Sequence, residues 1–114
     1  MTKNNCSFRA DKCEGVLTLT LRGEIDHHGA GKLRAEMDAL IYEERPQKTV
    51  LDLAEIEFMD SSGLGLIMGR YALMKSLGGE LSVQNPNPRL VKIFELAGLG
   101  RIIQIEMPSK EESK

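Results

Sequence analysis

The sequence has few of the residues that mark disulfide-rich or metal-binding proteins. Tryptophan is absent, aromatic residues make up 4% of the 114 residues, and the only cysteines are Cys6 and Cys13. Two cysteines are too few for a disulfide framework, so we expect two free thiols in a reducing compartment. No other cysteine or histidine lies near them with ligand spacing, and a structural zinc site usually needs four ligands. We therefore expect no bound metal.

Long apolar runs and an excess of charge are also absent. No stretch approaches the roughly 18 apolar residues of a membrane-spanning helix. The first residues, Met1 to Asn5, lead into polar sequence without the apolar core of a signal peptide. The formal net charge is -2, which argues against the basic stripe of a nucleic-acid-binding surface. We expect a cytoplasmic protein that contacts neither membrane nor nucleic acid directly.

The hydrophobic pattern instead predicts alternating strands and helices. Residues 16–21 alternate as in a strand that stops at Gly23, and a weaker strand over residues 6–10 precedes it across a short turn, which indicates a hairpin. The other predicted elements are helices over residues 29–44, 62–77 and 88–97 and strands over residues 49–53, 80–83 and 101–105. Helices that alternate with single strands imply crossover connections. The sequence thus predicts one α/β domain over residues 1–107, followed by a polar tail over residues 108–114. Its sheet should be mixed and mainly parallel, with about five strands, an N-terminal hairpin and helices packed on it.

The helix predicted over residues 62–77 is unusually apolar. After its first residue only Arg70, Lys75 and Ser76 are polar. At 100° per residue one apolar face comprises Leu64, Ile67, Met68, Tyr71 and Met74, and the other comprises Gly65, Leu66, Gly69, Leu73 and Leu77. One face can cover the sheet, while the second either packs on other core elements or is exposed for a partner. The pattern leaves both alternatives open.

The segment Phe58-Met59-Asp60-Ser61-Ser62-Gly63-Leu64-Gly65 begins this helix and carries the chemistry that we expect. At a strand-to-helix junction, free backbone N–H groups and the helix dipole favour an anion. The simplest interpretation of both serines is that they cap the helix. One cap suffices, however, and Gly63 and Gly65 lack side chains where the backbone of another molecule could approach.

A second polar cluster, Gly23-Glu24-Ile25-Asp26-His27-His28, follows an earlier strand. The ends of parallel strands gather at one edge of a sheet, so we expect Asp26 close to Ser61. For His27 and His28 the simplest interpretation is a solvated loop and helix start.

The serine segment lacks the patterns of two common kinds of site, a serine hydrolase and a nucleotide-binding loop. A serine hydrolase needs a base oriented by a third group and often a Gly-x-Ser-x-Gly elbow, but Asp60 precedes this serine pair. No phosphate-binding glycine loop follows a strand, so the chain itself is expected to bind no ATP.

The segment from Phe58 to Gly65, followed by Gly69-Arg70-Tyr71, closely resembles the phosphorylation segment of bacterial anti-sigma factor antagonists, which are STAS-domain proteins. The segment from Gly23 to His28 matches a second landmark of this family and is most similar to the sporulation-specific antagonists of spore-forming bacilli. Gly78-Gly79-Glu80 and the segment from Phe94 to Leu99 match later landmarks in the same order. The resemblance covers roughly residues 8–105. The chain departs from the sporulation pattern at Gly29, where a threonine is expected.

This resemblance implies a protein-binding switch without enzymatic activity or a cofactor of its own. The unphosphorylated antagonist binds an anti-sigma factor that is also a serine kinase and so releases a sporulation sigma factor. The kinase holds the ATP and phosphorylates the serine that matches Ser61, and a serine phosphatase reverses the modification. The expected partner-binding residues are Asp26, His27, His28, Asp60, Ser62, Gly63 and Gly65. The alternatives are an antagonist for a stress-response sigma factor, against which the double histidine counts, and, more remotely, a serine-dependent hydrolase.

Overall fold

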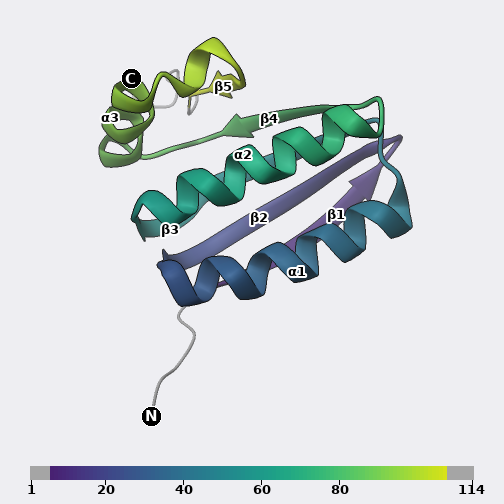
Figure 1. Ribbon diagram of the computed structural model, residues 1–114, viewed down its shortest axis with the longest axis horizontal. Coiled ribbons are helices and arrows are strands. Elements are labelled where there is room, and N and C mark those ends of the chain that lie inside the picture. The colour runs from purple at the N-terminus through teal and green to yellow at the C-terminus, as the bar shows by residue number, and fades with distance from the viewer. Residues whose placement is uncertain (1–5, 108–114) are drawn as a thin grey trace, which may run out of the picture.

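The computed structural model describes residues 6–107, which form a five-stranded sheet with helices packed on it (Figure 1). The strands are β1 (Cys6–Cys13), β2 (Val16–Ile25), β3 (Lys48–Met59), β4 (Glu80–Gln84) and β5 (Gln104–Glu106), in that order across the sheet. The helices are α1 (His27–Glu44), α2 (Ser61–Ser76), α3 (Pro88–Ala97) and the short 3₁₀ helix η1 (Leu99–Arg101). β1 is antiparallel to β2, and every other pairing is parallel. The predicted α/β class and mixed sheet are confirmed; the predicted tail, residues 108–114, lies outside the described residues.

The N-terminal hairpin forms as predicted, but its second strand is longer than expected. The turn consists of Glu14 and Gly15, with φ angles of 50° and 84°, which suits a two-residue turn whose twist matches that of the strands. The prediction that the strand stops at Gly23 is wrong, because β2 continues to Ile25. Its pairing with β3 shifts register between Gly23 and Glu24, and such an irregularity lets a strand continue past a residue that would otherwise end it.

The boundaries of β3 and β5 also differ from those predicted. β3 extends to Met59, so Phe58 and Met59 end a strand instead of lying in a loop. The last strand covers three residues from Gln104, because Leu99–Arg101 forms the 3₁₀ helix η1 immediately after α3. The predicted strand over residues 101–105 therefore begins three residues too early.

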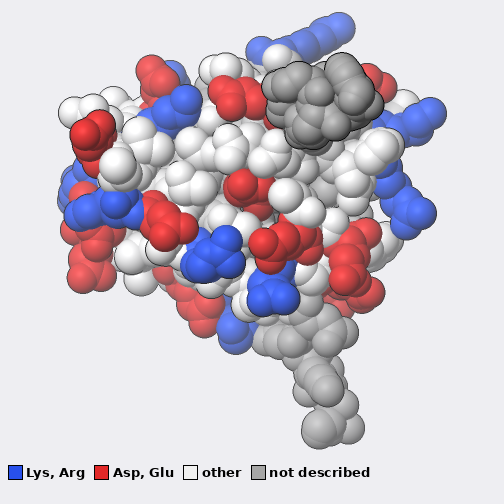
Figure 2. Space-filling model, turned by 180° about the vertical axis from the view of Figure 1, so that it is seen from behind, with Lys and Arg blue, Asp and Glu red and all other residues white. Residues whose placement is uncertain are grey.

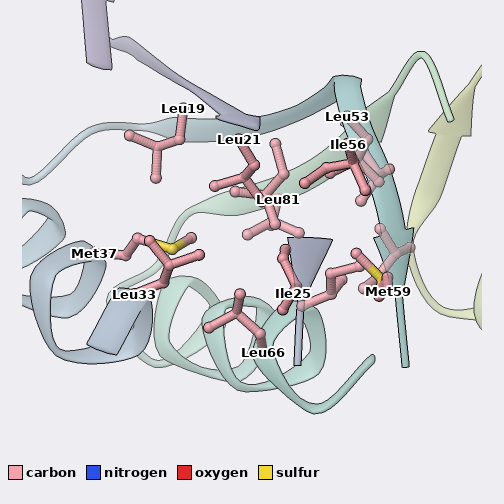
Figure 3. Packing of buried hydrophobic residues seen from close by; sticks show 14 of the residues in the cluster. Leu19, Leu21, Ile25, Leu33, Met37, Leu53, Ile56, Met59, Leu66 and Leu81 are labelled. Atoms are coloured by element: carbon pink, nitrogen blue, oxygen red, sulfur yellow. The ribbon is translucent and has the colours of Figure 1, made fainter. Parts of the chain in front are cut away.

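The core lies between one face of the sheet and the helices α1 and α2, which run side by side across that face (Figures 1 and 3). α1 contributes Leu33, Met37 and Ile41, spaced four residues apart, to the core. They belong to one buried cluster with fully buried leucines of β2 and β3: Leu17, Leu19, Leu21, Leu51 and Leu53. The view from behind shows acidic and basic side chains interspersed over the other side of the molecule (Figure 2).

The structure settles how the apolar helix α2 uses its residues. The buried stripe is Gly63, Leu66, Ile67, Arg70 and Met74, so it runs between the two predicted faces and draws on both. Most flanking apolar residues are half-buried and pack against the core: Leu64, Met68, Tyr71, Leu73 and Leu77. α2 therefore has no separate apolar interface, and its exposed residues near the start are small or polar.

The two cysteines lie at opposite ends of β1. Cys6 is buried and Cys13 is exposed, and both are free, as expected. Burial raises the pKa of the Cys6 thiol. No helix within residues 6–107 is long and apolar enough to cross a membrane.

Candidate functional site

Two strand-to-helix junctions lie next to each other at the carboxyl edge of the sheet. Ile25 ends β2 and is paired with Met59, which ends β3. Asp26 and Asp60 follow directly, and the Asp60 backbone N–H donates to the Ile25 carbonyl oxygen at 3.2 Å. The structure thus brings together the two polar segments that the strand-end argument expected to meet.

Each junction is closed by an aspartate that caps the following helix. The Asp26 carboxylate accepts a hydrogen bond from the Gly29 backbone N–H at 2.9 Å, so α1 begins at His27 and not at Gly29. The Asp60 carboxylate accepts one from the Ser62 N–H at 2.8 Å. The interpretation of the serines as caps is therefore wrong: aspartate caps as well as serine does, and Asp60 stands one residue earlier.

Because Asp60 caps α2, the two serines are left without that role. Ser61 is the first residue of α2 and is exposed, while Ser62 is half-buried. Within residues 6–107 no hydrogen bond engages either hydroxyl group. The Ser61 hydroxyl is thus accessible and makes no hydrogen bond within the described residues. It lies at a helix end that favours negative charge.

His27 and His28 begin the first turn of α1 and are both exposed, so the expected solvated helix start is confirmed, while the expected loop is absent at these two residues. Their ring centroids lie 6.1 Å apart in an edge-to-face arrangement. In the part of the chain that the structure describes, no hydrogen bond joins either imidazole to Ser61 or Ser62. The nucleophile and base of a serine hydrolase are therefore not assembled here.

The two glycines of the serine segment have different surroundings. A Cβ atom on Gly63 would lie 2.0 Å from Cγ and 2.5 Å from Sδ of Met59. Gly63 is buried, and its missing side chain lets the first turn of α2 pack on the end of β3. Gly65 is exposed, and a Cβ atom there would meet nothing within 4 Å. Open space at this site is found beside Gly65, not beside Gly63.

A groove separates the N-terminal halves of α1 and α2. It has a volume of about 420 Å³ and is lined by His27, Ala30, Gly31, Arg34, Ser62, Gly65 and Leu66. Three predicted site residues, His27, Ser62 and Gly65, therefore border one depression.

An ion pair between the buried Arg70 and the half-buried Asp38 joins the same two helices. It was not predicted as a pair. Arg70 Nε lies 2.8 Å from Asp38 Oδ1, and the Arg70 side chain is 6% exposed. The Nε–H does not point at that oxygen; Nη2 donates a weak bond to Asp38 Oδ2 at 3.5 Å, and Nη1 donates to the Leu66 carbonyl oxygen at 3.3 Å. Burial lowers the pKa of Arg70, and Asp38 opposes that shift. In the sequence, the feature that could have indicated this ion pair is a single arginine, Arg70, in the middle of an apolar helix.

Residues 7–112 match the family model of the STAS domain. The chain belongs to the STAS-domain family. This match extends over nearly the whole sequence, so the resemblance drawn from the serine segment and its neighbouring landmarks is confirmed.

Curated relatives of this STAS domain are named as antagonists. An anti-sigma F factor antagonist of Paenibacillus polymyxa is 40% identical over 101 residues, which cover 89% of this chain and 86% of that protein. The anti-sigma-B factor antagonist of Bacillus subtilis (strain 168) is 33% identical over 106 residues, 93% of this chain and 95% of the relative. STAS anti-sigma factor antagonists are regulators and not enzymes, and the relatives of this chain are named antagonists.

Solved structures show the same fold. The anti-sigma factor antagonist SpoIIAA in its unphosphorylated form is 29% identical, with a TM-score of 0.76 over 94% of this chain and 92% of that one. SpoIIAA in the phosphorylated form matches with a TM-score of 0.69 over 94% and 96% of the two chains. The STAS fold of this chain therefore corresponds to both forms of that protein.

Proposed function

We propose that this STAS domain is an anti-sigma factor antagonist that works by partner switching. The unphosphorylated chain binds an anti-sigma factor that is also a serine kinase, and this binding releases a sporulation sigma factor. The kinase transfers phosphate from its ATP to Ser61, which ends binding, and a serine phosphatase restores the active form. The names of the relatives from Paenibacillus polymyxa and Bacillus subtilis support the antagonist role.

The observation that carries the proposal is the state of the Ser61 hydroxyl. It is exposed, it makes no hydrogen bond within residues 6–107, and the cap that the helix requires is supplied by Asp60. A kinase can therefore reach Ser61 without breaking an interaction on which the fold depends. The Ser62 side chain is half-buried and borders the groove, which makes it the less accessible acceptor.

Phosphate on Ser61 changes local charge more than local structure. It adds about -1.5 to -2 charges to a helix end that already favours an anion. SpoIIAA matches the present fold in both its phosphorylated and its unphosphorylated form, which supports a switch without a large rearrangement.

The added charge acts on the partner instead. A surface shaped for a neutral hydroxyl would face a dianion close to the carboxylates of Asp26 and Asp60. Repulsion and desolvation of a few kcal/mol would weaken binding by orders of magnitude, since about 1.4 kcal/mol corresponds to a factor of ten.

Intact-mass spectrometry after incubation with the cognate kinase and ATP tests the assignment. The wild type and Ser62→Ala should each gain one phosphate, whereas Ser61→Ala should gain none while it still binds the kinase. Ser62→Ala is the matched control, because it removes the neighbouring hydroxyl by the same change. Peptide mapping that placed the phosphate of the wild type on Ser62 would contradict the proposal.

A second candidate is the stress-response switch. The 33% identity to the anti-sigma-B factor antagonist of Bacillus subtilis extends over 93% of this chain and favours it. The double histidine and the higher identity to an anti-sigma F factor antagonist favour the sporulation role. Calorimetric titration against an anti-sigma F factor and an anti-sigma-B factor separates the two, and the first should bind more tightly.

A further inference from the structure

The groove between α1 and α2 is lined by small residues and one positive charge, and the switch at Ser61 does not use these features. On α1 its lining residues, His27, Ala30, Gly31 and Arg34, follow one another at the spacing of a single helical face. On α2 the lining residues are Ser62, Gly65 and Leu66, again one face near the start of the helix. The small residues hold the groove open: a Cβ atom on Gly31 or on Gly65 would meet nothing within 4 Å.

The charged side chain in this groove is Arg34, and no carboxylate lines it. Arg34 is exposed and takes part in no ion pair among residues 6–107. The next turn of each helix explains why Arg34 has no ion-pair partner there. One turn beyond Arg34 on α1 stands Asp38, and one turn beyond Leu66 on α2 stands Arg70, so the Arg70–Asp38 pair lies one helical turn beyond these lining residues. Asp38 forms its ion pair with Arg70. The guanidinium of Arg34 therefore has no acidic partner in the described part of the chain.

We propose that this groove receives an acidic side chain of the anti-sigma factor, whose carboxylate pairs with the Arg34 guanidinium. The inference rests on the proposed function and adds a recognition contact to it. Arginine presents planar, paired N–H donors that match a carboxylate. The open space beside the exposed Gly31 and Gly65 gives an aspartate or glutamate side chain room to enter, and the half-buried Ser62 supplies a further hydroxyl.

A charge-swap experiment tests this contact with the anti-sigma factor of the same organism as the probe. In calorimetric titration, Arg34→Gln should raise Kd about tenfold and Arg34→Glu more strongly, as for close complementary charges at interfaces. One exposed acidic residue of the anti-sigma factor, when changed to lysine, should restore binding to Arg34→Glu. Gly31→Leu, a change into open space that favours a helix, should also weaken binding at least several-fold, roughly as Arg34→Gln does.

Lys32→Gln is the matched control. It removes the same charge from the same helix, but Lys32 stands two residues, or about 200°, from Arg34, and pairs with Glu36 at 3.2 Å. It should change Kd by less than about twofold. Equal losses for Arg34→Gln and Lys32→Gln, or binding by Arg34→Gln as tight as wild type, would overturn the groove contact.

Ser61→Asp in the same titrations separates the two hypotheses. If the wild type binds and Ser61→Asp binds more weakly, the switch stands whatever Arg34 does. If the wild type does not bind at all, the proposed function fails first.

Discussion

Removal of one partner of the Arg70–Asp38 pair should destabilise the protein unequally, depending on which partner is removed. The Arg70 side chain is 6% exposed, whereas Asp38 is 32% exposed. Asp38→Ala leaves a buried guanidinium whose remaining partner is the Leu66 carbonyl oxygen at 3.3 Å. Arg70→Met leaves a carboxylate that water can reach and fills the vacated space with an apolar chain of similar length.

The loss of a fully buried partner costs about 3–5 kcal/mol, and the partial exposure of Asp38 places the expected value at the lower end. We expect Asp38→Ala to lower the free energy of unfolding by about 3 kcal/mol and Arg70→Met by about 1 kcal/mol. For a domain of this size the first change should lower Tm by roughly 10–15 °C.

Urea unfolding followed by circular dichroism measures both values. Glu36→Ala is the control, because it breaks the Lys32–Glu36 pair, whose side chains are about half exposed, and should cost under about 0.5 kcal/mol. If Asp38→Ala were no more destabilising than Glu36→Ala, or if Arg70→Met were the more destabilising change, the argument from unequal burial would be refuted.

Four further predictions concern two glycines, Asp26 and the two cysteines. Gly63→Ala should destabilise the fold by about 1–3 kcal/mol through overpacking, while Gly65→Ala should leave stability unchanged or raise it by up to about 1 kcal/mol; equal urea midpoints would contradict this difference. Asp26→Asn should keep its cap and hence its Tm, but alter anti-sigma factor affinity or the phosphorylation rate, and wild-type values in both assays would remove Asp26 from the site. Ellman's reagent should modify Cys13 quickly and Cys6 slowly in the folded protein, and similar rates would argue against burial. Because burial raises the pKa of Cys6 above its ordinary value of 9.0, this thiol should lower stability as the pH rises above 9.0, where the unfolded chain ionises first.

The order of strands and helices could be predicted because the hydrophobic period changes at each junction. Leu33, Met37 and Ile41 recur at helical spacing and are indeed buried together. Boundaries were less predictable where a tertiary interaction overrides a local signal. Gly23 resembles a strand end, yet the parallel pairing with β3 carries β2 on to Ile25.

The position of the site could be predicted from the sequence, but the roles of its individual residues could not. The strand-end argument brought Asp26 and Ser61 to one edge, because parallel strands end together. It could not assign the caps, since aspartate and serine cap helices about equally well and the choice depends on backbone geometry. Nor could it distinguish Gly63, which packs on Met59, from Gly65, which borders a groove.

The central claim is that phosphate on Ser61 abolishes binding by its charge while the fold persists. The most direct measurement is the Kd of the purified unphosphorylated and phosphorylated chains for the anti-sigma factor, with circular dichroism and Tm recorded on the same samples. The account predicts a Kd at least about a hundredfold higher after phosphorylation, a smaller increase for Ser61→Asp, which carries about one charge, and unchanged spectra throughout. Equal affinities for the two forms, or a phosphorylated form that has lost its fold, would contradict it.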